Sequence, residues 1–190
     1  MIVLGLTGSI GMGKTTTAGI FRERGIPVWD ADAAVHRLYT PGGAAVAPIA
    51  ALFPSVVRQG AVDRDALRAI IAESPEALKK IEAIVHPLVA EDRWVFLERI
   101  DPLVVLDVPL LFEIGLSKTV DRIAVVSVPS DVQRQRVLDR GTMSEDDFDA
   151  ILAKQIPDRD KRAGADYIID TTTLETAQRD VDTILEDLLS

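Results

Sequence analysis

The stretch IVLGLTGSIGMGKTTTAGIF, residues 2–21, decides the fold of this chain. Its first five residues are apolar or glycine, which predicts a short buried strand over 2–6. A glycine-rich turn follows, and the pattern from Lys14 to Arg24 predicts a helix that Gly25 closes. A strand, a glycine-rich loop and a helix in direct succession indicate an α/β domain.

The loop from Gly8 to Thr15 matches the phosphate-binding pattern G-x-x-x-x-G-K-[ST]. Its glycines let backbone N–H groups curl around phosphate oxygens, Lys14 adds charge at the β and γ phosphates, and the Thr15 hydroxyl can ligate Mg²⁺. The alternative is a glycine-rich turn with a chance lysine, but the flanking strand and helix favour a nucleoside triphosphate site. The residues predicted to bind the nucleotide are Gly8, Ser9, Gly11, Met12, Gly13, Lys14, Thr15 and Thr16.

Composition narrows the class of protein. The chain has 190 residues, 47% of them hydrophobic, and a formal net charge of −9. It holds no run of ~18 apolar residues and no secretory signal, so we expect no membrane partner. Cysteine is absent, which favours a reducing cytoplasm. The acidic balance disfavours nucleic acid as a partner.

The rest of the chain alternates short apolar runs with helical patterns. Further strands are predicted at 27–29, 103–108, 122–128 and 167–169. A helical pattern is predicted from 32 to about 100, including a helix from 74 that is interrupted or continuous at 86–87. Further helices are predicted over 130–140, 144–155 and 174–188. A capping box of Ser130 and Gln133 is expected to open the helix at 130. This order predicts an α/β fold with a five-stranded, mainly parallel sheet.

Two missing sequence patterns distinguish between the classes of protein that contain such a loop. The chain has no asparagine and no D-x-x-G sequence, so it lacks the guanine reader and the second switch element of GTPases. A small-molecule kinase instead needs a carboxylate near the acceptor and cations around the transferred phosphoryl group.

Carboxylates follow two of the predicted strands. Asp30 and Asp32 come after the strand at 27–29, where one can take the proton of an acceptor hydroxyl. The compatible alternative is a helix N-cap at Asp30 with Asp32 in the first turn. Asp107 ends the strand at 103, where it serves either as a Mg²⁺ ligand, directly or through water, or as a plain turn residue.

Cationic candidates lie later in the chain. Arg136 and Arg140 share a face of one predicted helix, and Arg159 and Arg162 follow in a polar segment. They form either a lid over ATP or a solvated surface. His86 is the last candidate, and a lone histidine is more often structural than catalytic.

Taken in order, these segments resemble dephospho-coenzyme A kinases over nearly the whole chain. The matching segments are GLTGSIGMGKTT (5–16), IPVWDADAAVHRL (26–38), HPLV (86–89), VPLLFE (108–113), ILAKQ (151–155) and ADYIID (165–170). The resemblance implies transfer of the ATP γ-phosphoryl group to the ribose 3′-hydroxyl of dephospho-coenzyme A. Asp32 would orient or deprotonate that hydroxyl, Lys14 and Arg140 would stabilise charge, Thr15 would ligate Mg²⁺, and His86 would contact the substrate.

The resemblance also implies an organisation into three parts. These are a nucleotide-binding core at 1–30, 101–135 and 163–190, a helical coenzyme-A-binding insertion at 31–100, and a lid at 136–162. We expect a monomer or a small homo-oligomer. The chain departs from the family in two segments: Thr171-Thr172-Thr173 stand where Asn and Gly are common near adenine, and Met12 replaces a smaller residue.

Two other functions remain open at this stage. One is a kinase of another metabolite or nucleotide on the same scaffold. The other is a nucleotide-dependent regulatory protein that binds ATP without an acceptor. The paired carboxylates at Asp30 and Asp32 favour a kinase over the regulatory protein.

Overall fold

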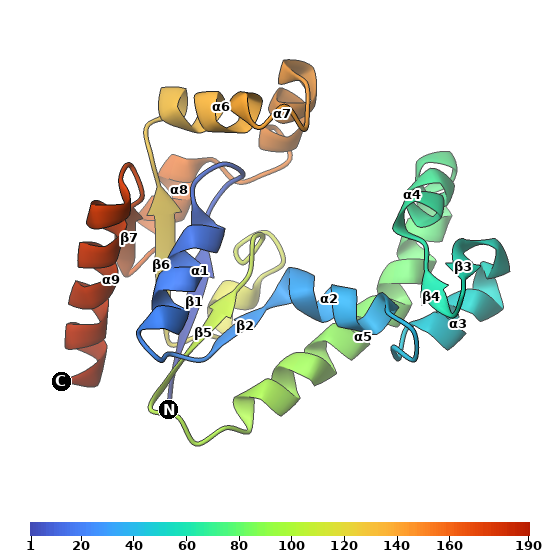
Figure 1. The fold of residues 1–190 in the computed structure, drawn as a ribbon, viewed down its shortest axis with the longest axis horizontal. Coiled ribbons are helices and arrows are strands. Elements are labelled where there is room, and N and C mark those ends of the chain that lie inside the picture. The colour runs from blue at the N-terminus through green and yellow to red at the C-terminus, as the bar shows by residue number, and fades with distance from the viewer. The chain divides into compact units, whose positions relative to one another are not determined.

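The computed structural model describes all of residues 1–190 and divides into two compact units. The first unit comprises Met1–Trp29 and Ile100–Ser190, and the second comprises Asp30–Arg99. Figure 1 shows the strands and helices of both units. Among the helices, none combines the length and the apolar character that crossing a membrane requires.

The first unit is built on a five-stranded sheet in the order β2-β5-β1-β6-β7. The strands are β1 (Ile2–Thr7), β2 (Val28–Asp30), β5 (Leu103–Asp107), β6 (Arg122–Ser127) and β7 (Tyr167–Asp170). β1 lies in the centre and pairs in parallel with β5 and β6, and β6 pairs in parallel with β7. All five residues of β5 are buried, as expected of a strand covered on both faces. The predicted α/β fold with a five-stranded, mainly parallel sheet is therefore confirmed.

Helices surround this sheet. They are α1 (Lys14–Glu23), α6 (Ser130–Asp139), α7 (Glu145–Leu152), α8 (Asp158–Ala163) and α9 (Leu174–Leu189), with a short 3₁₀ turn at Leu116–Lys118. α9 packs on both α1 and β7. One core cluster joins these elements, with Phe21, Leu4 and Ile169 among its fully buried members. The sheet and the α1–α9 layer thus form the rigid base of the phosphate loop.

The second unit has its own core. It contains α2 (Ala31–Tyr39), α3 (Val46–Leu52), α4 (Arg64–Glu73), α5 (Pro75–Leu97), a 3₁₀ turn at Pro54–Val56 and a two-stranded hairpin of β3 (Val57–Arg58) and β4 (Ala61–Val62). Leu38, Ile49 and Ile81 belong to its buried cluster. An ion pair between Arg37 and Asp92, 2.6 Å apart, joins α2 to α5.

The helical prediction for 32–100 is wrong at the β3–β4 hairpin. Gln59 and Gly60 form its two-residue loop with positive φ angles of 51° and 77°. Two positive φ angles in succession are characteristic of the tight turn that joins short antiparallel strands. The interruption considered at 86–87 does not occur, because α5 continues through Pro87. The buried residues Ile81 and Val85 keep this part of α5 packed on the core although proline removes one backbone hydrogen bond.

The capping prediction is wrong for α6 and the structure places a capping box elsewhere. Pro129 is the N-cap of α6 and Ser130 is already helical, so no side chain caps that end. The capping box is instead at α7, where the Ser144 hydroxyl accepts from the Asp147 N–H at 3.2 Å and the Asp147 carboxylate accepts from the Ser144 N–H. The charged residues after α7, which carried no predicted element, form α8.

Candidate active site

The phosphate loop connects β1 to α1 and depends on two of its glycines for different reasons. Gly13 is the N-cap of α1 with φ = +89°, a conformation that favours glycine, and no side chain caps the helix. The N–H groups of the first turn are therefore left for an anion. At Gly8, an added Cβ would lie 2.3 Å from Cγ2 of Val126, so no larger residue fits without a shift of β6.

Met12 occupies the middle of the loop with its side chain in the core. Only 2% of the residue is exposed, and its Sδ accepts a hydrogen bond from the Val128 N–H at 3.3 Å. Its carbonyl accepts from the Thr171 hydroxyl at 2.6 Å. Met12 therefore offers only its backbone to a nucleotide, and the buried Ser9 lies in the same loop.

Lys14 and Asp107 form an ion pair at the carboxyl end of the central strands. Asp107 stands opposite Leu6 in the register of β1 and β5, so the end of β5 lies beside the start of the phosphate loop. The side chains are 15% and 3% exposed, respectively. Asp107 thus holds the lysine at the edge of the sheet, while Thr15 and Thr16 are exposed at the start of α1.

A pocket of about 400 Å³ opens beside this loop within the first unit. Its walls come from the loop and α1, the end of α6, and the segment between β7 and α9: Gly11, Gly13, Thr16, Thr17, Arg136, Asp139, Arg140, Thr171, Thr173, Leu174 and Ala177. Its volume lies in the range of small-ligand sites. Arg140 is the exposed C-cap of α6, and its side chain makes no hydrogen bond or ion pair.

Arg136 has a different position from Arg140 although both line the pocket. Its guanidinium donates to the carbonyls of Thr171 and Thr172 at 2.8 and 3.0 Å. Arg136 therefore fixes the wall of the pocket formed by the segment after β7. Arg159 lies outside the pocket on α8, where it is exposed and pairs with Asp160.

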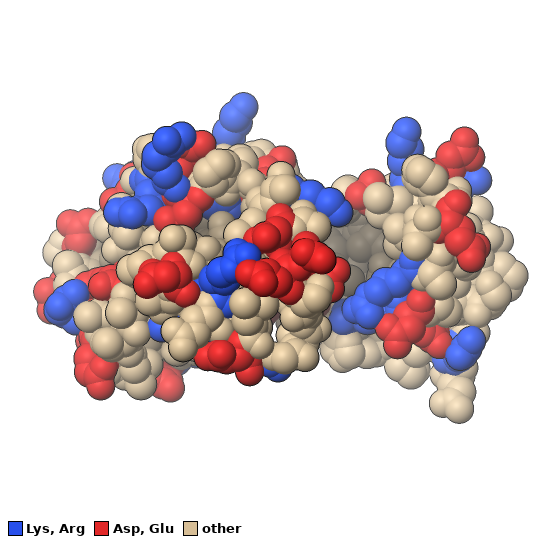
Figure 2. Space-filling view, turned by 90° about the horizontal axis from the view of Figure 1, so that it is seen from above, with Lys and Arg blue, Asp and Glu red and all other residues tan.

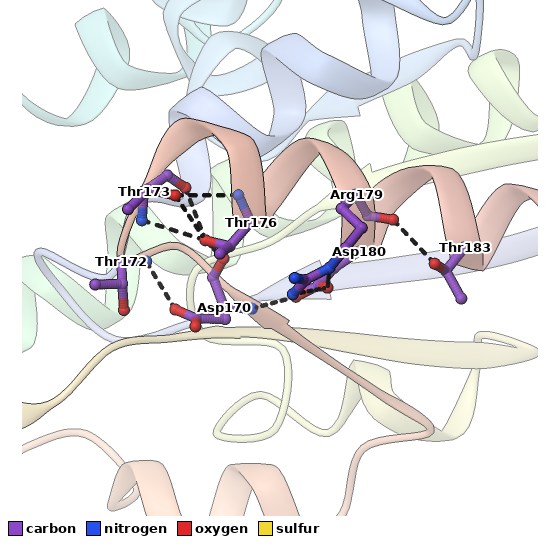
Figure 3. A network of polar contacts seen from close by, with 7 residues as sticks. All are labelled: Asp170, Thr172, Thr173, Thr176, Arg179, Asp180 and Thr183. Carbon is purple, nitrogen blue, oxygen red and sulfur yellow. Dashed lines mark hydrogen bonds and ion pairs between the residues drawn. The ribbon is translucent and has the colours of Figure 1, made fainter.

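The threonine segment that replaces the expected Asn and Gly is rigidly held (Figure 3). The Thr172 N–H donates to the Asp170 carboxylate at 2.8 Å. Hydrogen bonds from the side chain and the backbone of Thr172 hold the pKa of the Asp170 carboxyl below its usual range. Thr173 and Thr176 form a second capping box at the start of α9. Asp180 accepts from the Asp170 N–H at 2.9 Å and so joins α9 to the end of β7. Hydrogen bonds within the first unit thus hold this wall of the pocket.

The candidate acceptor residues belong to the second unit. Asp30 is the N-cap of α2, with its Oδ1 accepting from the Ala33 N–H at 2.9 Å, which confirms the capping interpretation of that residue. Asp32 is exposed in the first turn of α2 and its carboxylate makes no hydrogen bond or ion pair. His86 is exposed on α5. The predicted site residues therefore divide between the units, with the phosphate loop, Asp107 and Arg140 in the first.

Three polar side chains of the first unit, two of them buried and Gln155 half-buried, were not among the predicted site residues. Gln133 is 4% exposed on α6, Gln155 follows α7, and Lys161 on α8 is fully buried. Gln155 ends the segment ILAKQ, which is the one signal in the sequence that pointed to this region. Single glutamines and lysines are usually surface residues, so composition gave no reason to select the other two.

The parallel sheet, the glycine-bounded loop at the end of its central strand and the adjoining pocket define a P-loop nucleotide-binding protein of the kinase type.

Acidic and basic side chains are interspersed on the face shown in Figure 2.

Comparison with known proteins identifies the family. Residues 2–176 match the family model of dephospho-CoA kinase. The dephospho-CoA kinase of Cereibacter sphaeroides is 59% identical over 177 residues, which cover 92% of this chain and 89% of that protein. The dephospho-CoA kinase of Jannaschia sp. is 56% identical over 94% of this chain and 92% of that protein. The chain belongs to the dephospho-CoA kinase family.

Solved structures share the fold of this chain. The crystal structure of TT1252 from Thermus thermophilus superposes with a TM-score of 0.87 at 33% identity, over 100% of this chain and 98% of that one. Dephospho-CoA kinase from Campylobacter jejuni has the same fold, with a TM-score of 0.69 at 20% identity over 98% and 96% of the two chains. The resemblance seen in the sequence is confirmed, and the chain is a kinase that phosphorylates dephospho-CoA in the last step of coenzyme A biosynthesis.

Proposed function

We propose that this kinase transfers the γ-phosphoryl group of ATP to the ribose 3′-hydroxyl of dephospho-CoA, with Asp32, Lys14 and Arg140 as its catalytic residues. The hydroxyl oxygen forms a bond to the γ-phosphorus, the bond from that phosphorus to the β–γ bridging oxygen breaks, and ADP leaves. The hydroxyl proton goes to Asp32. Positioning and charge stabilisation carry most of the catalysis in such transfers.

The single observation that carries the donor half is the phosphate loop beside its pocket. The uncapped N-terminus of α1 and the Lys14 ammonium provide the charge that phosphates need, and the pocket of about 400 Å³ adjoins them for the nucleoside. Arg140 has no protein partner on the rim of that pocket, so its guanidinium is available to the transferring phosphoryl group.

The acceptor half rests on residues of the second unit. The Asp32 carboxylate is exposed and has no protein partner, so it is available to accept a proton. We assign residues 31–100 to coenzyme A binding, with His86 as a contact, and residues 136–162 to a lid over ATP. Closure of a lid excludes water and limits hydrolysis of ATP.

We propose Mg²⁺ as the metal of the reaction, with Thr15 and Asp107 as its protein ligands. Mg²⁺ prefers oxygen ligands and usually binds through one or two protein groups together with phosphates and water. The exposed Thr15 hydroxyl and the Asp107 carboxylate fit that donor set, and the chain has no cluster of three acidic or histidine side chains that would form an all-protein site. When bound, Mg²⁺ would neutralise charge on the phosphates. Asp107, directly or through water, would then share its charge between the metal and Lys14.

The remaining predictions concern context. We propose a cytoplasmic enzyme that acts as a monomer or a small homo-oligomer and has no nucleic acid partner. The pathway role and the acidic net charge of −9 support this proposal.

The decisive experiment mixes the purified protein with Mg-ATP and dephospho-CoA and measures coenzyme A by mass spectrometry. Coenzyme A, which already carries the 3′-phosphate, serves as the control acceptor. We expect phosphorylation of dephospho-CoA only, and fragmentation of the product should place the phosphate on the 3′-oxygen. A protein that binds ATP yet forms no coenzyme A would refute the proposal.

A further inference from the structure

Two glutamine side chains hold one residue of the phosphate loop from both of its backbone groups. The Ile10 N–H donates to Oε1 of Gln155 at 3.3 Å. The Ile10 carbonyl accepts from Nε2 of Gln133 at 2.7 Å. The chemistry of the backbone sets the orientation of each amide, because an N–H requires an acceptor and a carbonyl requires a donor.

These glutamines come from segments far from the loop in sequence. Gln133 lies on α6 and is 4% exposed, so its amide would lack a partner without Ile10. Gln155 lies between α7 and α8, next to Ile156. The main chain of α6 also lies against the loop, since a Cβ on Gly11 would be 3.2 Å from the Gln133 carbonyl oxygen. The two hydrogen bonds are therefore part of a close contact.

Order in this loop has a direct bearing on ATP binding. A loop with glycines at positions 8, 11 and 13 has more conformational freedom to lose than an ordinary loop. Its N–H groups bind phosphate only when they converge on one point, and a loop that is ordered beforehand loses less entropy on binding. Tethers on Ile10, midway along the loop, reduce that loss.

We infer that Gln133 and Gln155 are positioning residues that hold Ile10 and thereby keep the phosphate loop in its ATP-binding conformation. They act through Ile10 and do not touch the reacting atoms. Gln155 has a second effect, since it connects the loop to the segment 136–162 that we assign to the lid. The inference rests on the proposed binding of ATP phosphates by this loop.

The first test removes each hydrogen bond. Gln133→Met and Gln155→Met keep the approximate size of the side chain but offer no amide. We expect each to raise the KM for ATP about tenfold, the effect of one lost hydrogen bond, and to change the KM for dephospho-CoA less than about twofold. Gln135→Met on the exposed face of α6 is the matched control and should behave as wild type. Values for ATP within about twofold of wild type in both variants would overturn the inference.

The second test uses the opposite roles of the two amides. In Gln133→Glu the side chain can donate to the Ile10 carbonyl only when protonated, so its defect relative to wild type should shrink as the pH falls from about 8 to about 5.5. In Gln155→Glu the ionised carboxylate accepts from the Ile10 N–H, so its defect should not shrink over that range. A role in folding alone predicts no opposite trends, and the same trend in both variants would overturn the inference.

Two precautions keep the result decisive. If Gln133→Met does not fold, which circular dichroism would show, Gln155→Met and the two glutamate variants still test the inference. In both tests the dissociation constant of ATP can be measured instead of its KM. Failure of the proposed function is then distinguishable, because wild-type protein would bind ATP with the expected dependence on Gln133 and Gln155 while making no coenzyme A.

Discussion

Replacing Lys161 by methionine removes a cation that solvent does not reach. The Lys161 side chain is 0% exposed and its Nζ lies 2.9 Å from Oε1 of Glu113, whose side chain is 15% exposed. That distance gives a charge–charge contact, but the ammonium makes no well-directed hydrogen bond. Oε1 of Glu113 also accepts from the Ile156 N–H at 3.0 Å, and nearby Asp158 accepts from the Ser127 hydroxyl at 2.8 Å. The ion pair thus joins α8 and its preceding segment to the loop after β5.

The expected magnitudes follow from which charge is left behind. Breaking a buried ion pair from one side usually costs about 3–5 kcal/mol, because the other charge stays buried without its partner. We expect about 3 kcal/mol for Lys161→Met, since Glu113 keeps a backbone hydrogen bond and some solvent. Glu113→Gln should cost about 3–5 kcal/mol, since its ammonium partner is wholly buried. The double variant leaves neither charge and should cost only about 1–2 kcal/mol.

The pH dependence gives an independent check. Burial raises the pKa of the Glu113 carboxyl, but the Lys161 ammonium and backbone hydrogen bonds outweigh it and hold that pKa below its usual range. In wild type this carboxyl therefore contributes stability above its unfolded pKa of about 4.3, which is lost only as the pH falls through the lower folded pKa. In Lys161→Met the ammonium no longer opposes burial, which is the largest single influence on the pKa of the Glu113 carboxyl, so we expect that pKa to rise above the unfolded value even though the backbone hydrogen bonds remain. The destabilisation of this variant should therefore decrease as the pH falls from about 7.5 to about 5.5.

Urea denaturation followed by the fluorescence of Trp29 measures these free energies in the first unit. Trp29 is 3% exposed on β2, whereas Trp94 is 67% exposed. Measuring all variants in a Trp94→Phe background leaves Trp29 as the only fluorescent tryptophan and should change the stability little. The reasoning about this buried pair would be refuted if the losses in unfolding free energy of the two single variants simply summed to the loss in the double variant. It would also be refuted if the destabilisation by Lys161→Met did not change with pH.

Four other variants test the site more briefly. Lys14→Met should lower kcat by at least about 10²-fold in a steady-state assay, because the charge at the phosphates is lost, and near-normal turnover would contradict its catalytic role. Asp32→Asn should lower kcat by about 10²-fold or more while the KM for ATP stays unchanged, and wild-type turnover would reduce Asp32 to a residue of the first helical turn. Gly8→Ala should raise the KM for ATP or prevent folding, because its Cβ would meet Val126 at 2.3 Å; circular dichroism separates the two, and wild-type kinetics would exclude the close approach. Ser144→Ala should destabilise α7 by about 1 kcal/mol through loss of its capping box, as measured by amide hydrogen exchange, whereas unchanged protection would show that the cap is dispensable.

The parts of the fold that were predicted correctly depend on local patterns. The run at 2–6 and the run at 103–106 are apolar without interruption, because each strand is covered on both faces of the sheet. The phosphate loop was recognisable because its glycines and Lys14 have chemical reasons to stand at fixed spacings. The N-cap at Asp30, which the sequence offered beside a role at the acceptor, was recognisable for a similar reason, since the cap acts on a backbone N–H three residues away.

The features that were missed depend on residues distant in sequence or on competing local signals. Ser130 and Gln133 match the spacing of a capping box, but Pro129 takes the N-cap position and the Gln133 amide bonds to Ile10 instead. The hairpin at Gln59 was hidden because each of its strands has only two residues, too few to show an alternating pattern. Lys161 is buried only because Glu113, 48 positions earlier by its number, accompanies it.

The phosphate loop shows why its sequence and its function can be read separately. Residues 8–15 specify the chemistry, but the loop is held by Gln133, Gln155 and Thr171, all from the last third of the chain. A search for the motif detects only residues 8–15. It does not detect the residues that hold the loop, because hydrogen bonds to backbone groups can come from any segment that the fold brings near. Substitutions at these three positions should therefore impair ATP binding while the loop sequence remains intact. It follows that an intact G-x-x-x-x-G-K-[ST] sequence is necessary for this donor site but does not ensure its geometry.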